Sequence, residues 1–307
     1  MSRIAVCAVA ALVLASAGLA GSRPISIDRI GVCSWSWRLP MLEVMDRMDK
    51  NGIRGVNLAL MPFIENDKYH GGSESTEVWD VLQGKVKSGT IVVMSTMIST
   101  VGEDYTTPDS IRRTGGIVPD EHWEANRARF ERGARLTEEL GCRYLLTHAG
   151  FLDAKDPLAL SKYRSRVLWI RDVCARHGVN LILETGQETA EELAAFLASV
   201  PGVYVNFDPA NMLMYGKGCP LEAMRQILPW VRQVHVKDAL LAHEPGAWGM
   251  EVPWGKGEVG GAAFVAELEK LGFVGNYVIE RESGEDRIKD IVRAKDLLLR
   301  SGVGADE

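Results

Sequence analysis

Short apolar runs alternate with longer amphipathic stretches along most of the chain. The runs are rich in Val, Ile and Leu and show little polar alternation, which is typical of parallel strands buried on both faces. Eight strands are predicted, at residues 30–33, 55–60, 90–97, 144–147, 180–183, 203–207, 231–236 and 277–279.

The stretches between these runs carry apolar residues at helical spacing, such as Met41, Val44, Met45 and Met48. Strands and helices alternate without a linker or a low-complexity tract, and eight such units predict a single-domain α/β fold, the (β/α)8 TIM barrel. A doubly wound open sheet is the alternative, which the lack of a glycine-rich phosphate motif at the first turn disfavours. Helices are predicted at residues 41–51, 78–87, 120–140, 157–177, 189–200, 221–228, 262–271 and 287–301.

Two segments carry no clear pattern and are predicted to be long loops. Residues 98–119 contain several Thr and Gly, and residues 239–260 are rich in Gly, Pro and Trp. The first is of the kind that covers a site, although an insertion without such a role would look the same.

The first 20 residues differ in character from the rest. Arg3 precedes a short apolar segment and then small residues, with cleavage expected after Ala17 or Ala20. A retained membrane anchor or a buried helix is disfavoured, because the apolar segment is shorter than the ~20 residues that span a bilayer. We therefore expect a secretory signal peptide at residues 1–20, a barrel at residues 21–307, and an exported protein in the periplasm or outside the cell.

Composition limits the partners. The chain has 307 residues and is 46% hydrophobic, which is enough for a full core. Its net charge of -6 disfavours nucleic acid and anionic membranes as partners, and we expect no membrane contact once the signal is removed. A homo-oligomer is compatible with the sequence. The four cysteines beyond residue 20 lack metal-like spacing, so isolated thiols are favoured over a disulfide.

Four consecutive predicted strands, the fifth to the eighth, each end in a residue that can bind a metal. These residues are Glu184, Asp208, His235 and Glu280. A single carboxylate at a strand end can instead cap the next helix, as Asp208 before Pro209 can. In a TIM barrel, however, all strand C-terminal ends meet on one face, so the four side chains would converge.

The donor types indicate which metal such a site would hold. Carboxylates with one imidazole and no thiolate suit Mn2+, the ion we expect, with Mg2+, Co2+ and Zn2+ as alternatives. A divalent cation would also offset the repulsion between the ionised Glu184 and Glu280.

Several further residues are candidates for binding a substrate. Lys237 should lie on the same side of its strand as His235, where it could hold a substrate oxygen or form a structural salt bridge. Trp35, Trp37 and Trp254 fall in predicted loops, where rings either stack on sugar C–H faces or pack in the core. His148 follows the fourth strand and is interpreted as a substrate-binding or supporting residue.

The motifs LILE, FDPAN, VHVKD with PWGKGEVG, and VIERE, in this order, resemble those of the xylose isomerase-like barrel superfamily of sugar phosphate isomerases and epimerases. The resemblance is concentrated in residues 181–282. It implies metal ligation by Glu184, Asp208, His235 and Glu280. In the epimerase branch the two Glu also act as an acid/base pair, one on each face of the substrate.

The sequence departs from that pattern at three places. The epimerase and endonuclease branches carry a His where this chain has Asn211, which can bind a sugar hydroxyl but is a poor metal ligand. The epimerase branch has an Arg where Leu241 stands, so the substrate contacts must differ. The further ligands of the endonuclease branch are missing, and residues 239–260 stand in their place.

The resemblance and the residues together favour a divalent-metal-dependent isomerase or epimerase that acts on a sugar or keto-sugar through an enediolate. Export and the lack of an Arg/Lys cluster point to a neutral carbohydrate substrate. A lyase or dehydratase acting on a keto-sugar or keto-glycoside through the same enediolate is one alternative. A non-catalytic sugar-binding barrel is another, disfavoured because it needs no acid/base pair, and a phosphodiesterase acting on nucleic acid is disfavoured by the missing ligands.

Overall fold

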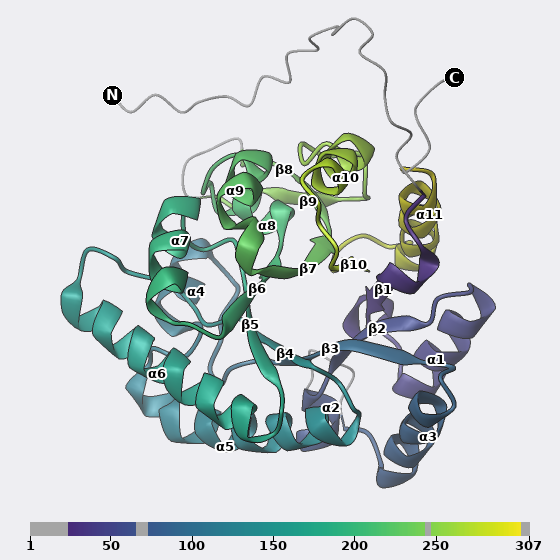
Figure 1. Cartoon of the computed structure of the whole chain (residues 1–307), viewed down its shortest axis with the longest axis horizontal. Coiled ribbons are helices and arrows are strands. Elements are labelled where there is room, and N and C mark those ends of the chain that lie inside the picture. The colour runs from purple at the N-terminus through teal and green to yellow at the C-terminus, as the bar shows by residue number, and fades with distance from the viewer. Residues whose placement is uncertain (1–23, 66–72, 243–246, 302–307) are drawn as a thin grey trace, which may run out of the picture.

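The computed structural model describes residues 24–65, 73–242 and 247–301. Eight parallel strands close into a barrel in the order β1, β10, β7, β6, β5, β4, β3, β2 (Figure 1). This arrangement confirms the predicted single-domain (β/α)8 barrel. The strands are β1 (Ile30–Cys33), β2 (Gly55–Ala59), β3 (Val92–Ile98), β4 (Tyr144–Thr147), β5 (Asn180–Glu184), β6 (Val203–Phe207), β7 (Val231–Val236) and β10 (Asn276–Ile279).

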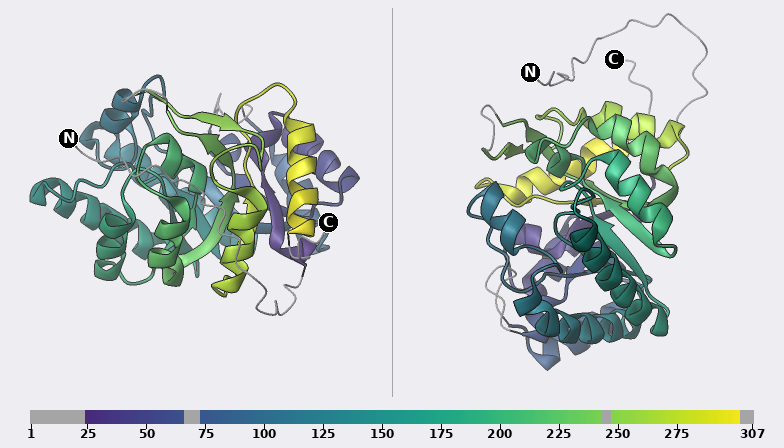
Figure 2. Two further views of the ribbon diagram at one scale, coloured as in Figure 1. Left: turned by 90° about the horizontal axis from the view of Figure 1, so that it is seen from above. Right: turned by 90° about the vertical axis from the view of Figure 1, so that its left-hand side faces the viewer.

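Helices surround the barrel, and the last one, α11, lies beside the first strand where the ring closes (Figure 2). The predicted helices are all present, with ends shifted by up to two residues. The principal helices are α1 (Met41–Lys50), α3 (Thr76–Lys87), α5 (Asp120–Glu139), α6 (Pro157–Arg176), α7 (Ala190–Ser199), α9 (Pro220–Ile227), α10 (Gly261–Lys270) and α11 (Arg287–Arg300).

The barrel strands carry apolar side chains on both faces, which explains why their sequences are continuous apolar runs. One face packs against the helices in the main core, as Phe207 does by stacking on Phe264. The other face fills the barrel interior, where Met97, Leu146 and Ile182 form a separate cluster. A parallel strand that is covered on both sides has no face in contact with solvent, so its sequence needs no alternating polar residues.

The segments predicted to be loops contain regular structure. Within residues 239–260, β9 (Met250–Val252) pairs antiparallel with β8 (Asp238–Leu240), and we call this pair the β8–β9 arm. Within residues 98–119 lies α4 (Pro108–Thr114), whose first turn is closed by a reciprocal capping box between Thr107 and Ser110. Two short helices, α2 (Met61–Ile64) and α8 (Pro209–Met214), also follow barrel strands.

Two of the three candidate tryptophans are core residues. Trp37 and Trp254 are 3% and 4% exposed and belong to the main hydrophobic core. This burial favours the alternative that the two rings pack in the core over sugar stacking. Large apolar rings next to barrel loops gain more from burial than from exposure.

Other expectations concern the ends of the chain and the thiols. The predicted signal, residues 1–20, lies outside the described residues. Within the described part of the chain, no helix is long and apolar enough to cross a membrane. The four cysteines beyond residue 20 are unpaired, as predicted.

Candidate metal centre and active site

The four predicted ligands converge at the C-terminal face of the barrel. Glu184 ends β5, His235 lies near the end of β7, and Asp208 and Glu280 directly follow β6 and β10. All four are buried, and one donor atom from each lies within 4.8 Å of the others. Ligands about 2.1 Å from one ion lie within about 4.2 Å of each other, so the donor atoms are close to the spacing that a single ion needs.

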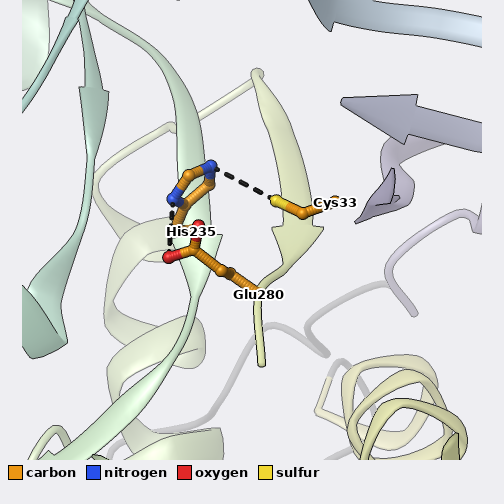
Figure 3. Close-up of side chains that lie close together, drawn as sticks. All are labelled: Cys33, His235 and Glu280. Carbon is orange, nitrogen blue, oxygen red and sulfur yellow. Dashed lines mark hydrogen bonds and ion pairs between the residues drawn. The ribbon is translucent and has the colours of Figure 1, made fainter. Parts of the chain in front are cut away.

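His235 is the centre of this cluster. Its Nδ1 atom lies 3.1 Å from Glu184 Oε1, 3.4 Å from Glu280 Oε2 and 3.7 Å from Asp208 Oδ2. Its Nε2 atom points the other way, 3.7 Å from the sulfur of Cys33 (Figure 3). The imidazole therefore presents Nδ1 to the three carboxyl groups.

Asp208 performs two tasks with its two oxygens. Oδ1 accepts a hydrogen bond from the backbone N–H of Asn211, so the residue caps α8 as its sequence allows. Oδ2 is buried and has no hydrogen-bond partner among the described residues. Its nearest cations, His235 Nδ1 and Lys237 Nζ, are both 3.7 Å away, beyond hydrogen-bond distance. A buried carboxylate oxygen without a hydrogen bond is costly, and a metal ion at the centre of the cluster would satisfy it. The residues present thus fit a divalent cation.

Charged neighbours within the cluster shift the pKa values of its residues. Burial opposes ionisation of Glu280, but Lys237 and His235 outweigh it and lower the pKa of Glu280 to about 2. Burial likewise opposes ionisation of Glu184, and His148 and His235 bring its pKa below the ordinary value. Burial lowers the pKa of His235, but Glu280 leads the charges that raise it well above the usual range. Both glutamates are therefore carboxylates at neutral pH.

Lys237 is a buried cation that joins the two sides of the site. Its Nζ atom lies 2.8 Å from Glu280 Oε2 and 2.6 Å from Glu282 Oε2. It also donates to Asn211 Oδ1 at 3.4 Å, while Asn211 Nδ2 donates to Glu184 Oε1 at 3.4 Å. Both residues predicted to contact a substrate thus lie beside the carboxylates, and Lys237 also makes the predicted salt bridge.

His148 and Trp35 flank the carboxylates as well. His148 Nε2 lies 3.3 Å from Glu184 Oε2, so this His supports a ligand. The indole N–H of Trp35 donates to Glu280 Oε1 at 2.9 Å, and the ring meets His235 edge to face. The structure therefore brings four of the six predicted substrate-binding residues to the site, the exceptions being Trp37 and Trp254.

A second grouping, Cys33 with His235 and Glu280, could also hold a metal by distance alone. Cys33 faces Nε2 whereas Glu280 faces Nδ1, on opposite edges of one ring (Figure 3). Burial raises the pKa of the Cys33 thiol far above its usual value, which disfavours the thiolate that metals require. The oxygen-rich grouping is the metal centre that the chemistry favours.

The β8–β9 arm is fixed to the site by two acidic residues. The carboxylate of Asp238 accepts backbone N–H groups from Gly255, Gly257 and Val259 at 2.9–3.1 Å, which shapes the PWGKGEVG motif. On β9, Glu251 binds Arg281 and the N–H of the residue after it. These bonds hold the loops that follow β7 and β10 together beside the metal centre.

Sequence inspection missed residues that reach the site from the first half of the barrel. Cys33 and Asn57 contact the Nε2 edge of His235 from β1 and β2. Asn57 lies within an apolar run, GVNLAL, and a polar residue inside a buried run was the available signal.

The fold and the converging donors define a TIM barrel with a candidate divalent-metal centre. Residues 45–300 match the family described as xylose isomerase-like TIM barrel, and the chain belongs to this family.

The individual proteins that resemble this chain have low sequence identity to it. The xylose isomerase domain protein from Planctomyces limnophilus is 27% identical, with a TM-score of 0.77 over 94% of this chain and all of that one. The probable 3-DHS dehydratase AsbF from Bacillus anthracis (17% identity, TM-score 0.67, 88% and 98% covered) and an L-ribulose 3-epimerase (15%, 0.65, 89% and 95%) share the fold. The uncharacterized protein YihM of Escherichia coli K12 is 27% identical over 117 residues, which span only 37% of this chain and 36% of that protein.

Proposed function

We propose that the protein is a divalent-metal-dependent isomerase or epimerase of a sugar or keto-sugar, with Glu184 and Glu280 as its acid/base pair. One observation carries the proposal. Two buried carboxylates from strands three places apart in the barrel face one imidazole nitrogen, at 3.1 and 3.4 Å. A site of this kind can remove a proton on one side of a bound carbon and return it on the other.

A bound divalent cation, with Mn2+ favoured, would polarise a substrate carbonyl and offset the repulsion among the three carboxyl groups. Glu184, Asp208, His235 and Glu280 would hold it. The donor set does not distinguish Mn2+ from Mg2+, Co2+ or Zn2+, and all four accept oxygen and imidazole ligands.

Each carboxylate has its own cationic neighbour. Burial lowers the pKa of His148, but Glu184 and Glu103 raise it above the ordinary value, and its Nε2 atom lies 3.3 Å from Glu184 Oε2. Lys237 holds protons 2.8 Å from Glu280 Oε2. Lys237 can therefore supply the proton that Glu280 returns to the substrate carbon after Glu184 has removed the α proton from the opposite face. Glu184 then releases its proton to solvent, and Lys237 regains one from solvent. Asn211 and Trp35, adjacent to the same carboxylates, are proposed to contact substrate hydroxyls.

Elimination by a lyase or dehydratase is the second candidate. It starts with the same proton removal, and Lys237 supplies a buried ammonium group that could protonate a leaving oxygen. The fold shared with a probable dehydratase is compatible with this alternative.

Deuterium incorporation from D2O tests the proposal. We expect the protein loaded with Mn2+ to exchange an α proton of one member of a panel of ketoses and 3-keto-glycosides. Glu280→Gln should reduce exchange by about 10²–10⁴-fold, the usual contribution of a positioned acid or base. EDTA should abolish the exchange, and renewed Mn2+ should restore it.

The products separate the candidates. Exchange with retention of all substrate atoms indicates isomerisation or epimerisation, whereas loss of water or of an aglycone indicates elimination. Absence of exchange from every substrate, in protein shown to contain its metal, would contradict the enediolate mechanism and favour a binding barrel.

A further inference from the structure

We propose that Asn57 is a positioning residue of the metal centre, whose side-chain carbonyl oxygen accepts a hydrogen bond from Nε2–H of His235 and so directs Nδ1 to the ion. The inference rests on the metal centre of the proposed function. It assigns a role to β2, which lies three places from β7 around the barrel.

The geometry places the Asn57 carboxamide against the imidazole. Asn57 is fully buried in the barrel interior, and its Nδ2 atom lies 3.4 Å from His235 Nε2. Its other terminal atom, Oδ1, is buried without a hydrogen-bond partner among the described residues. As oriented, the amide therefore points its donor at the ring and leaves its acceptor unused.

What binds at Nδ1 determines whether Nε2 carries a proton, and this decides which atom of the Asn57 carboxamide should face Nε2. If Nδ1 binds a metal, the neutral imidazole must carry its single proton on Nε2. Nε2 is therefore a hydrogen-bond donor when the metal is bound, and an NH2 group opposite it would set donor against donor.

Turning the carboxamide by 180° removes the donor–donor conflict at Nε2. The two orientations have nearly the same shape and differ only in their hydrogen bonding. After the turn, Oδ1 faces Nε2–H and gains the partner that it lacks. We infer that this is the functional orientation.

Cys33 is the other group near Nε2, at 3.7 Å. Sulfur is a weak hydrogen-bond acceptor. The carboxamide oxygen is the stronger acceptor, so the orientation of His235 depends chiefly on Asn57.

Zn2+ affinity tests the inference, with Zn2+ as a diamagnetic probe. Partners of a metal-bound His typically contribute 10–100-fold to metal affinity. We expect Asn57→Leu, which keeps the bulk and removes the acceptor, to weaken Zn2+ binding by about this factor. Asn57→Asp, which keeps an acceptor, should bind nearly as the wild type does. Asn206→Leu is the matched control, because Asn206 is also fully buried on a barrel strand and has no side-chain hydrogen bond to His235.

Histidine-selective 15N NMR of the Zn2+-loaded protein provides a readout that a general loss of packing would not reproduce. The Nε2–H proton of His235, identified by its loss in His235→Gln, should resonate downfield in the wild type and in Asn57→Asp. It should move upfield in Asn57→Leu. The wild-type spectrum decides by itself if Asn57→Leu fails to fold, because an unprotonated Nε2 would overturn the inference.

The remaining outcomes are equally distinct. Unchanged Zn2+ affinity and an unchanged Nε2–H resonance in folded Asn57→Leu would overturn the role of Asn57. A loss of the same size in Asn206→Leu would overturn it too, because the effect would then not depend on His235. Failure of the wild type to bind Zn2+, Mn2+ or Mg2+ would overturn the metal centre of the proposed function instead.

Discussion

Glu188 is a buried carboxyl group outside the metal centre. It lies four residues beyond Glu184 and is 6% exposed. Burial raises its pKa from 4.5 to about 7, and the partial attraction of Lys217 opposes this rise. Since the unfolded chain would release this proton near pH 4.5, the folded protein binds more protons than the unfolded chain does between about pH 4.5 and 7.

The stability that Glu188 contributes should therefore fall as the pH rises through this window. Glu188→Gln, which cannot ionise, should gain about 2 kcal/mol over the wild type between pH 5 and pH 8. Urea unfolding of both proteins at the two pH values measures the difference. Glu191→Gln, at an exposed position of the next helix, should show no such gain, and parallel behaviour of Glu188→Gln and the wild type would contradict the assignment.

Single residues also show how far the site could be predicted. The four candidate ligands could be predicted because each lies at or next to the end of a strand, and barrel closure brings strand ends together whatever their separation in sequence. Asn57 could not be predicted as part of the site, because its contact with His235 crosses the barrel interior and depends on the register of the strands. For Trp37 and Trp254 the sequence left core packing and sugar stacking open, because loop position does not determine which way a ring points.

At the scale of elements, the eight barrel strands were predicted because burial on both faces leaves a continuous apolar run. The three-residue strands of the β8–β9 arm were missed, since Met250 is 57% exposed and the arm is held by backbone bonds to Asp238. The short helix α4 was missed because its capping box uses Ser110 in place of the usual Glu or Gln.

The loop around Asp238 yields a prediction about glycine. A Cβ atom on Gly257 would meet Asp238 Oδ1 at 2.2 Å and the carbonyl oxygen of Ala239 at 2.6 Å. Gly257→Ala must therefore displace the carboxylate from its backbone donors, and we expect a loss of about 1–3 kcal/mol in the free energy of unfolding.

Gly84 offers the matched control. It lies within α3, and a Cβ atom there would meet nothing within 4 Å. Gly84→Ala should stabilise the protein by about 0.5–1 kcal/mol, because alanine loses less conformational freedom in a helix. Denaturant unfolding measures both variants, and a neutral Gly257→Ala would show that the loop around Asp238 can relax.

At the scale of the whole molecule, export stays a prediction. Residues 1–20 have the order of a basic residue, an apolar segment and small residues that secretion signals share. Expressed in a secreting bacterium, the protein should be recovered outside the cytoplasm with an N-terminus after Ala17 or Ala20, as measured by intact mass. Full-length protein confined to the cytoplasm would contradict this expectation.

The β8–β9 arm leaves the barrel with a single residue, Lys237, between β7 and β8. At its other end, Glu251 holds the loop that carries Glu282, a second partner of the same lysine. Grafting the arm of a relative onto this barrel would therefore shift both ends of the ion pair between Lys237 and Glu282. The length of this arm and the charge balance around Lys237 are not independent variables, so an engineer should redesign them together.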